Sequence, residues 1–284
     1  MNDKVKIRQQ TFTAESAMER RQKRKLNIAR RRQRQKVSYY VPDIPGWEVD
    51  NDPTAKSYLN TYLRPAVRKD VPIIAEIYNQ WVLHSFIPED QEEVLEQSFR
   101  TLLETAHRES YPFIVAIKGD PPVDRRCTAP EDILGFALAE GCAGFGGGFG
   151  GLSGATAFIH VYVDRNCLRK GVGGRLLDQL LKRLSALYVS HFDRRIWVNP
   201  DQDPLYEQIP KRFHQILARR PVDGAHDPDI MWFDAFMNKY GFSEAHRTRG
   251  IARKPQAMTE SNGTGFMEVV TYQHEAESAT RVQR

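Results

Sequence analysis

The sequence has no apolar run long enough to cross a bilayer, and no apolar segment follows its first residues. A membrane-spanning helix needs about 18 or more apolar residues in a row, and a secretory signal needs a short apolar core behind a basic start. We therefore expect neither a membrane anchor nor secretion. The expected location is the cytoplasm, the nucleus or both.

Cysteine is scarce, and the three residues present, Cys127, Cys142 and Cys167, are widely spaced. An odd number at this spacing fits neither a disulfide framework nor the paired spacing of a zinc site. We expect reduced thiols and no bound metal. The 40% hydrophobic content of the 284 residues is enough for a sizeable globular core.

Acidic residues are absent from residues 20–36, where ten Lys and Arg residues gather. So few apolar residues accompany them that this stretch cannot fold alone, and we predict a disordered basic tail over residues 1–38. The tail is a plain solvated segment, a nuclear-import signal or a non-specific contact with nucleic-acid phosphates. Residues 39–60, which are rich in proline and aromatic residues, are expected to form an extended arm that packs on the domain.

The most informative stretch runs from Ala157 to Tyr188. Residues 157–163 are apolar and partly β-branched, as in a strand, and the glycines of residues 171–174 open a helix. Apolar residues then recur every three or four positions, which predicts one broad buried face. They are Val172, Leu176, Leu177, Leu180, Leu181, Leu184, Leu187 and Tyr188.

A strand, a basic glycine-rich turn and a helix together form a geometry that holds phosphate. The first amides of a helix lack intrahelical partners and carry the positive end of its dipole, and glycine lets an anion approach closely. Arg169, Lys170 and Arg175 add positive charge to the turn. The turn lacks the third glycine of a dinucleotide fingerprint and the Gly-Lys-Ser/Thr of a P-loop. We interpret it as an anion site rather than as a plain structural turn.

The rest of the pattern predicts one domain of alternating strands and helices over residues 61–275. Strands are expected at 62–67, 112–118, 133–140, 157–163, 194–198, 243–251 and 265–272. A first helix, capped by Asp70, is expected to run to about residue 82, and further helices are expected at 90–108, from Gly171 onward and at 230–239. An insertion over residues 201–228 is expected to contain a short helix at 211–219. The Gly-rich residues 141–155 are a flexible loop or a mobile lid, and 276–284 a flexible tail.

With this order of elements, the chain resembles the GNAT superfamily of acyl-coenzyme A-dependent N-acyltransferases. The resemblance covers about residues 61–273 and rests on VYVDRNCLRKGVGGRLL, FMNKYGF and AEIYNQWVLHS, the last of which, with YPFIVA, is most similar to the phosphinothricin acetyltransferase-like branch. It implies an α/β fold with a mixed, mostly antiparallel central sheet of about seven strands and helices on both faces.

The resemblance also implies a site for acetyl-CoA. The family's turn motif falls on residues 168–173, where both glycines match and Leu168 replaces the leading polar residue. The pyrophosphate would be held by the amides from Arg169 to Gly174, and the pantetheine arm would pair with the strand edge at Val161 and Val163. The implied coenzyme-binding residues are Val161, Val163, Leu168, Arg169, Lys170, Gly171, Val172, Gly173 and Gly174.

The catalytic groups depart from the family pattern. Phe158 stands where the branch has a glutamate, and Met237 stands where the family often has a tyrosine. His160 projects from the same strand face as Phe158 and Tyr162, so His160 is the candidate base and Tyr162 the candidate proton donor. A histidine with a purely structural hydrogen bond is the alternative for His160. Further candidates are Glu140, His84 and Asp229, and a backbone amide near Val163 would bind the oxyanion.

The expected activity is transfer of an acetyl or similar acyl group from acetyl-CoA to a primary amine of a small molecule or a protein. Because the family acid and tyrosine are both missing, a catalytically inactive acyl-CoA-binding module is one alternative. A chromatin-associated lysine acetyltransferase that uses the basic tail is another.

Overall fold

The computed structural model describes residues 59–122, 131–141, 155–185, 187–192, 196–207, 213–223, 227, 229–253 and 266–276. These residues belong to one compact unit, which spans residues 56–284. The predictions for the basic tail, for most of the extended arm and for most of the Gly-rich loop lie outside the described residues. They stay predictions.

The described residues form a mixed α/β domain. The strands are β1 (Thr61–Pro65), β2 (Phe113–Lys118), β3 (Ile133–Gly141), β4 (Thr156–Val163), β5 (Gln215–Val222), β6 (Ser243–Arg253) and β7 (Phe266–Glu275). The helices are α2 (Val71–His84), α3 (Glu96–Arg108), α4 (Val172–Leu184) and α5 (Ile230–Lys239), with short 3₁₀ turns η1 (Arg68–Asp70), η3 (Arg165–Cys167) and η5 (Pro204–Tyr206).

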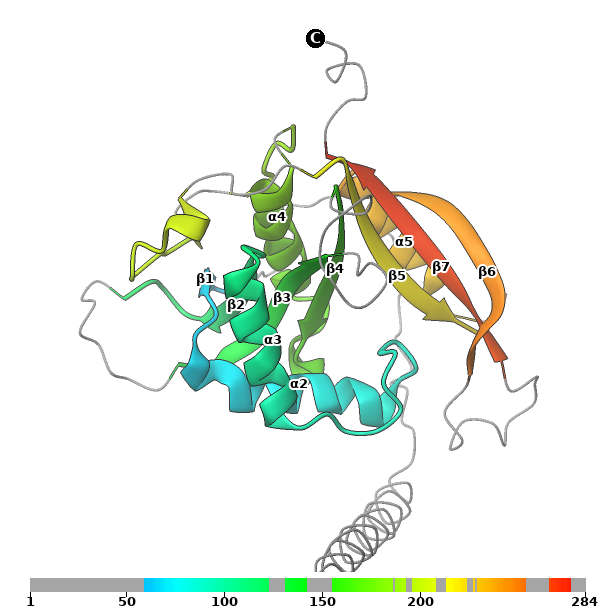
Figure 1. Cartoon of the computed structure of the whole chain (residues 1–284), viewed down its shortest axis with the longest axis horizontal. Helices are drawn as coiled ribbons and strands as arrows, with labels where there is room; N and C mark the ends of the chain where they lie inside the picture. Colours follow the sequence, from blue (N-terminus) through cyan, green and yellow to red (C-terminus); the bar gives the residue numbers. More distant parts are fainter. Residues whose placement is uncertain are drawn as a thin grey trace, which may run out of the picture. The chain divides into compact units, whose positions relative to one another are not determined.

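One seven-stranded sheet runs in the order β1-β2-β3-β4-β5-β7-β6, and β4 and β5 are its parallel pair while the other neighbours are antiparallel. Helices cover both faces of its first half (Figure 1). On one face Tyr78 of α2 packs on Tyr162 of β4, while on the other Leu176 of α4 lies against Gly135 of β3. The predicted fold class is confirmed.

The pairing of β4 with β5 covers only Thr156, Ala157 and Phe158. Beyond Phe158 the two strands diverge, and β5, β7 and β6 fan away from β4 (Figure 1). The edge of β4 that faces β5 is therefore open from Ile159 onward within the described residues. This opening lies next to the start of α4, which follows β4 in the chain.

Two predicted elements are wrong. Residues 211–219 were expected to contain a helix, but 215–222 form β5, in which alternate residues from Ile216 to Val222 are buried and the residues between them at 215, 217 and 219 are more exposed. That period of two is typical of a strand. Residues 194–198 were expected to be a strand, and there the described residues contribute a single bridge from Trp197 to Leu63.

Several boundaries also differ. Helix α3 begins at Glu96, six residues later than expected, because the side chain of Asn79 both accepts from the amide and donates to the carbonyl of Val94 and so holds that segment extended. Helix α4 ends at Leu184, so Leu187 and Tyr188 lie beyond it. The Tyr188 hydroxyl instead donates to buried Asp178 at 2.7 Å.

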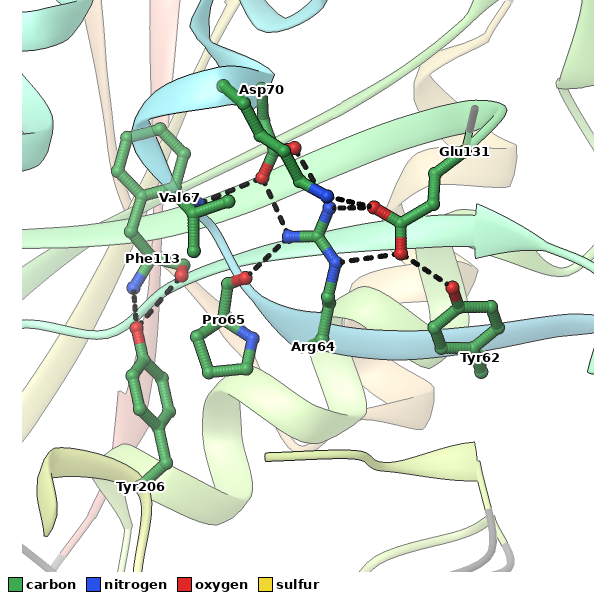
Figure 2. A network of polar contacts seen from close by, with 9 residues as sticks. Tyr62, Arg64, Pro65, Val67, Asp70, Phe113, Glu131 and Tyr206 are labelled. Atoms are coloured by element: carbon green, nitrogen blue, oxygen red, sulfur yellow. Dashed lines mark hydrogen bonds and ion pairs between the residues drawn. The ribbon is translucent and has the colours of Figure 1, made fainter. Parts of the chain in front are cut away.

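Asp70 occupies the N-cap position of α2 as predicted, but its side chain makes no capping hydrogen bond to this helix, because the carboxylate belongs to a buried ionic network (Figure 2). It accepts two hydrogen bonds from Arg64, at 2.7 and 2.8 Å, and one from the amide of Val67. Arg64 also donates to Glu131, at 2.6 Å, which accepts a further bond from Tyr62. The network links β1, η1 and Glu131, which lies just before β3.

Candidate functional site

The turn before α4 has the backbone geometry of an anion site. Gly171 adopts a left-handed conformation with φ of +84°, which glycine tolerates without steric cost, and Arg169 also has a positive φ, of +59°. Gly171 caps the helix without a side chain, and the Arg175 amide donates to the Gly171 carbonyl. The amides of residues 172–174, at the positive end of the helix dipole, therefore have no acceptor in the preceding turn.

The two glycines inside α4 play a packing role. A Cβ on Gly174 would lie 2.5 Å from the Tyr240 hydroxyl, and a Cβ on Gly173 would lie 3.5 Å from a Val163 methyl. Gly174 therefore makes room for Tyr240.

The side chains of the three basic residues of the turn bind different partners. Arg169 pairs with Asp229 at 3.0 Å, and Lys170 Nζ donates to the Asn166 carbonyl at 2.9 Å. The Arg175 guanidinium, which we expected near the phosphate, instead donates to the Leu59 carbonyl at 2.9 Å and to Thr61. Arg175 therefore fastens β1 to α4, and Arg169 and Lys170 carry the exposed charge of the turn.

The strand edge at Val161 and Val163 faces the opening between β4 and β5. The Asp164 amide donates to the Leu134 carbonyl of β3, and alternate residues of an antiparallel strand direct their peptide groups to the same neighbour. The peptide groups of Val161 and Val163 therefore point away from β3, toward the opening. The Val163 carbonyl accepts a hydrogen bond from Trp81 Nε1 at 2.8 Å, which leaves the Val163 amide and the Val161 peptide groups at this edge.

His160 forms a pair with Glu140 on the neighbouring strand. The distance from His160 Nε2 to Glu140 Oε1 is 2.9 Å, and the two side chains are 33% and 42% exposed. The hydrogen bond to His160 and the nearby charge of Arg219 hold the pKa of the Glu140 carboxyl below its usual value, although burial opposes this. Glu140 is therefore ionised at neutral pH and accepts a hydrogen bond from His160 Nε2; in the neutral imidazole this tautomer leaves Nδ1 as the acceptor.

Tyr162 lies on the same face but inside an aromatic cluster. Its ring centroid is 4.9 Å from that of Tyr78 and 5.4 Å from that of Phe136. Burial raises the pKa of the Tyr162 hydroxyl, so this phenol stays protonated and keeps a proton that it can donate.

The remaining candidates fall in different places. His84 ends α2, Asp229 pairs with Arg169, and Met237 is buried in the core. Phe158, which stands in place of the branch's acid, is covered by the Arg219 guanidinium, 4.2 Å from the ring centroid. Within the described residues no group of three or more His, Cys, Asp or Glu side chains could hold a metal.

Three features escaped the sequence reasoning. The pairing of Glu140 with His160 depends on the register of β3 with β4, and the position of Arg219 depends on the strand β5 that we expected to be a helix. The contact of the Tyr240 hydroxyl with the first turn of α4 depends on how the residue that follows α5, which ends at Lys239, packs on the neighbouring helix. Strand alternation over 215–222 was the signal that could have found Arg219.

Residues 79–209 match the acetyltransferase (GNAT) family. No curated protein matches the chain in a sequence search. None of the helices in the described ranges is both long and apolar enough to span a membrane.

Solved structures share the fold at low sequence identity. The yncA protein of Salmonella typhimurium, determined with its cofactor acetyl-CoA, is 18% identical with a TM-score of 0.53, over 77% of this chain and 95% of that one. A GNAT superfamily phosphinothricin acetyltransferase from Sinorhizobium meliloti, in complex with AcCoA, is 21% identical with a TM-score of 0.52, over 78% and 91%. The ribosomal-protein-alanine N-acetyltransferase of Brucella melitensis is 17% identical with a TM-score of 0.50, over 75% and 98%. At these identities the likeness concerns the fold.

Proposed function

We propose, because residues 79–209 match the acetyltransferase (GNAT) family, that the chain transfers an acetyl group from acetyl-CoA to a primary amine of a small molecule or a protein. The observation that carries the proposal is the arrangement along β4. An open strand edge leads to a glycine turn at a helix N-terminus, and His160, which pairs with Glu140 of the neighbouring β3, projects from the same strand as that edge. The acetyl-CoA bound in the Salmonella and Sinorhizobium structures supports the choice of donor.

The coenzyme would bind along the opening between β4 and β5. Its pyrophosphate would take the amides of residues 172–174 together with the charges of Arg169 and Lys170. Its pantetheine arm, which carries two amides, would pair with the peptide groups of Val161 as an added strand does. The thioester would then lie against β4, near His160.

The reaction requires one proton transfer to the protein. A neutral acceptor amine attacks the acetyl carbon with its nitrogen lone pair, and as the nitrogen–carbon bond forms the nitrogen loses a proton to His160 Nδ1, directly or through a water. The carbonyl oxygen becomes an oxyanion, for which the backbone amide of Val163 is a donor. The carbon–sulfur bond then breaks, and the thiolate takes a proton from Tyr162 or from water. Glu140 holds His160 in the tautomer that leaves Nδ1 unprotonated.

A binding module without catalysis is the second candidate. It is favoured by Phe158, which has no acid–base chemistry and lies under the Arg219 guanidinium at the position where the branch has a glutamate. Acetyl-CoA would then bind without release of coenzyme A.

The two functions are separated by measuring binding and turnover together. We expect calorimetry to detect acetyl-CoA binding, and a thiol-reactive dye to detect coenzyme A release with at least one member of an amine panel of peptides, polyamines and amino acids. Binding without release for every amine would support the binding module. Gly171→Val, which forces a β-branched residue into a left-handed conformation, should abolish binding while the circular dichroism spectrum is kept. Undiminished binding by that variant would refute the coenzyme site.

A further inference from the structure

Trp232 is an exposed aromatic residue beside the glycine turn. It lies in the first turn of α5, its side chain is 40% exposed, and the Arg169 guanidinium carbon lies 5.6 Å from its ring centroid. The acyl-transfer chemistry above uses Arg169 but makes no use of this indole. A large exposed ring at the border of an anion site therefore calls for an explanation of its own.

A row of three rings connects Trp232 to the start of α4. Phe236 stacks on Trp232 with centroids 5.3 Å apart and an angle of 16° between the planes, and Tyr240 follows at 5.1 Å from Phe236. Trp232 and Phe236 are four apart in sequence, so successive turns of α5 bring them to one face, and Tyr240 follows directly after the helix end. At the far end of the row the Tyr240 hydroxyl fits against Gly174. The row thus runs beside the glycine turn, with contacts to it at both ends.

The beginning of α5 is held firmly in this position. Asp229 binds Arg169 at 3.0 Å, and its own amide donates to Asp227 at 3.0 Å. Asp227 is buried and forms an ion pair with Arg220 of β5 at 3.1 Å. Asp229 and Trp232, which contact the Arg169 side chain, therefore both belong to an anchored helix end.

This inference rests on the coenzyme site proposed above. If the pantetheine arm leaves the turn along β4, the nucleotide leaves it on the other side, where Arg169 and Trp232 lie. A purine base has a flat π-face that stacks on an indole, and the intervening guanidinium matches the charge of the adjoining phosphates. We propose that Trp232 is the platform on which the adenine of coenzyme A stacks, with Arg169 between the base and the pyrophosphate.

The test compares two donors that differ only in the nucleotide. Calorimetry measures the affinity of the full-length protein for acetyl-CoA and for S-acetyl-phosphopantetheine, which keeps the thioester, the pantetheine arm and one phosphate. Trp232→Ala should weaken binding of acetyl-CoA by about five- to tenfold, the lower end of the range for a base stacked on an aromatic ring. Its affinity for acetyl-phosphopantetheine should stay within about twofold of the original.

Two further variants sharpen the comparison. Trp232→Phe, which keeps a flat ring, should restore most of the affinity for acetyl-CoA. Met231→Ala removes a neighbouring side chain that is 77% exposed and should change neither affinity. Thermal unfolding of each variant confirms that α5 stays folded.

Equal weakening of both donors by Trp232→Ala would overturn the proposal, because Trp232 would then act through packing of the turn. Unchanged acetyl-CoA affinity would overturn it as well. If neither donor bound the unsubstituted protein, the coenzyme site itself would fail and this inference with it, a result distinct from the other two.

Discussion

The pairing of His160 with Glu140 predicts an ordered series of kinetic defects. Hydrogen bonds to charged groups contribute about 1.5–3 kcal/mol when shielded from water. The His160 and Glu140 side chains are 33% and 42% exposed, so solvent screening reduces the expected contribution of their hydrogen bond to about 1 kcal/mol. A loss of about 1 kcal/mol in the transition state lowers kcat about fivefold.

We therefore expect Glu140→Gln, which keeps an acceptor oxygen but loses the charge, to lower kcat by less than Glu140→Ala, for which about fivefold is expected. His160→Ala removes the base itself and should cost about 100-fold or more. The KM for acetyl-CoA should change little in all three, because neither side chain belongs to the glycine turn. Coenzyme A release under saturating amine measures kcat, and thermal unfolding serves as the control for folding.

Two outcomes would refute the reasoning. If His160→Ala kept both its kcat and its pH–rate profile, His160 would not be the base, and the hydrogen bond to Glu140 would be structural. If His160→Ala lost activity while Glu140→Ala kept full kcat, Glu140 would not position the imidazole.

Two other predictions concern stability. Gly174→Ala places a methyl group 2.5 Å from the Tyr240 hydroxyl and should destabilise the fold by about 1–3 kcal/mol in urea unfolding. Adding Tyr240→Phe removes that hydroxyl and should recover part of the lost stability. If the double variant recovered no stability, the contact between Gly174 and Tyr240 would be contradicted. Arg64→Leu leaves the buried Asp70 carboxylate without its cation and Glu131 with Lys69 alone, and it should cost about 3–5 kcal/mol. Arg68→Leu, from an exposed pair with Glu104, should change little, and equal effects would refute a special role for the buried network. Burial raises the pKa of Glu131, but hydrogen bonds from Arg64, Tyr62 and Lys69 outweigh this and bring it from 4.5 down to about 2. The contribution of Glu131 to the free energy of unfolding should therefore be complete above about pH 4.5 and be lost as the pH falls through about 2. Acid unfolding curves of Glu131→Gln should lack this loss.

The order of the elements could be read from the sequence because each depends on neighbours in the chain. The period of three to four from Val172 to Leu184 specifies α4, and the left-handed position before a helix specifies glycine at residue 171. The same local reasoning failed at residues 215–222, where a strand was mistaken for part of a helix. It failed there because a short segment carries a weak period and its state depends on pairing with β7.

The arrangement of the site was decided by tertiary structure. That residues 172–174 offer amides to an anion follows from the sequence, since the start of a helix leaves these groups without local partners. That Glu140 meets His160, that Arg175 turns to β1, and that Tyr240 and Trp232 lie beside the glycine turn depend on strand register and on the packing of α5. These contacts join residues 20 to 116 positions apart, and sequence periodicity carries no information about which distant side chains meet.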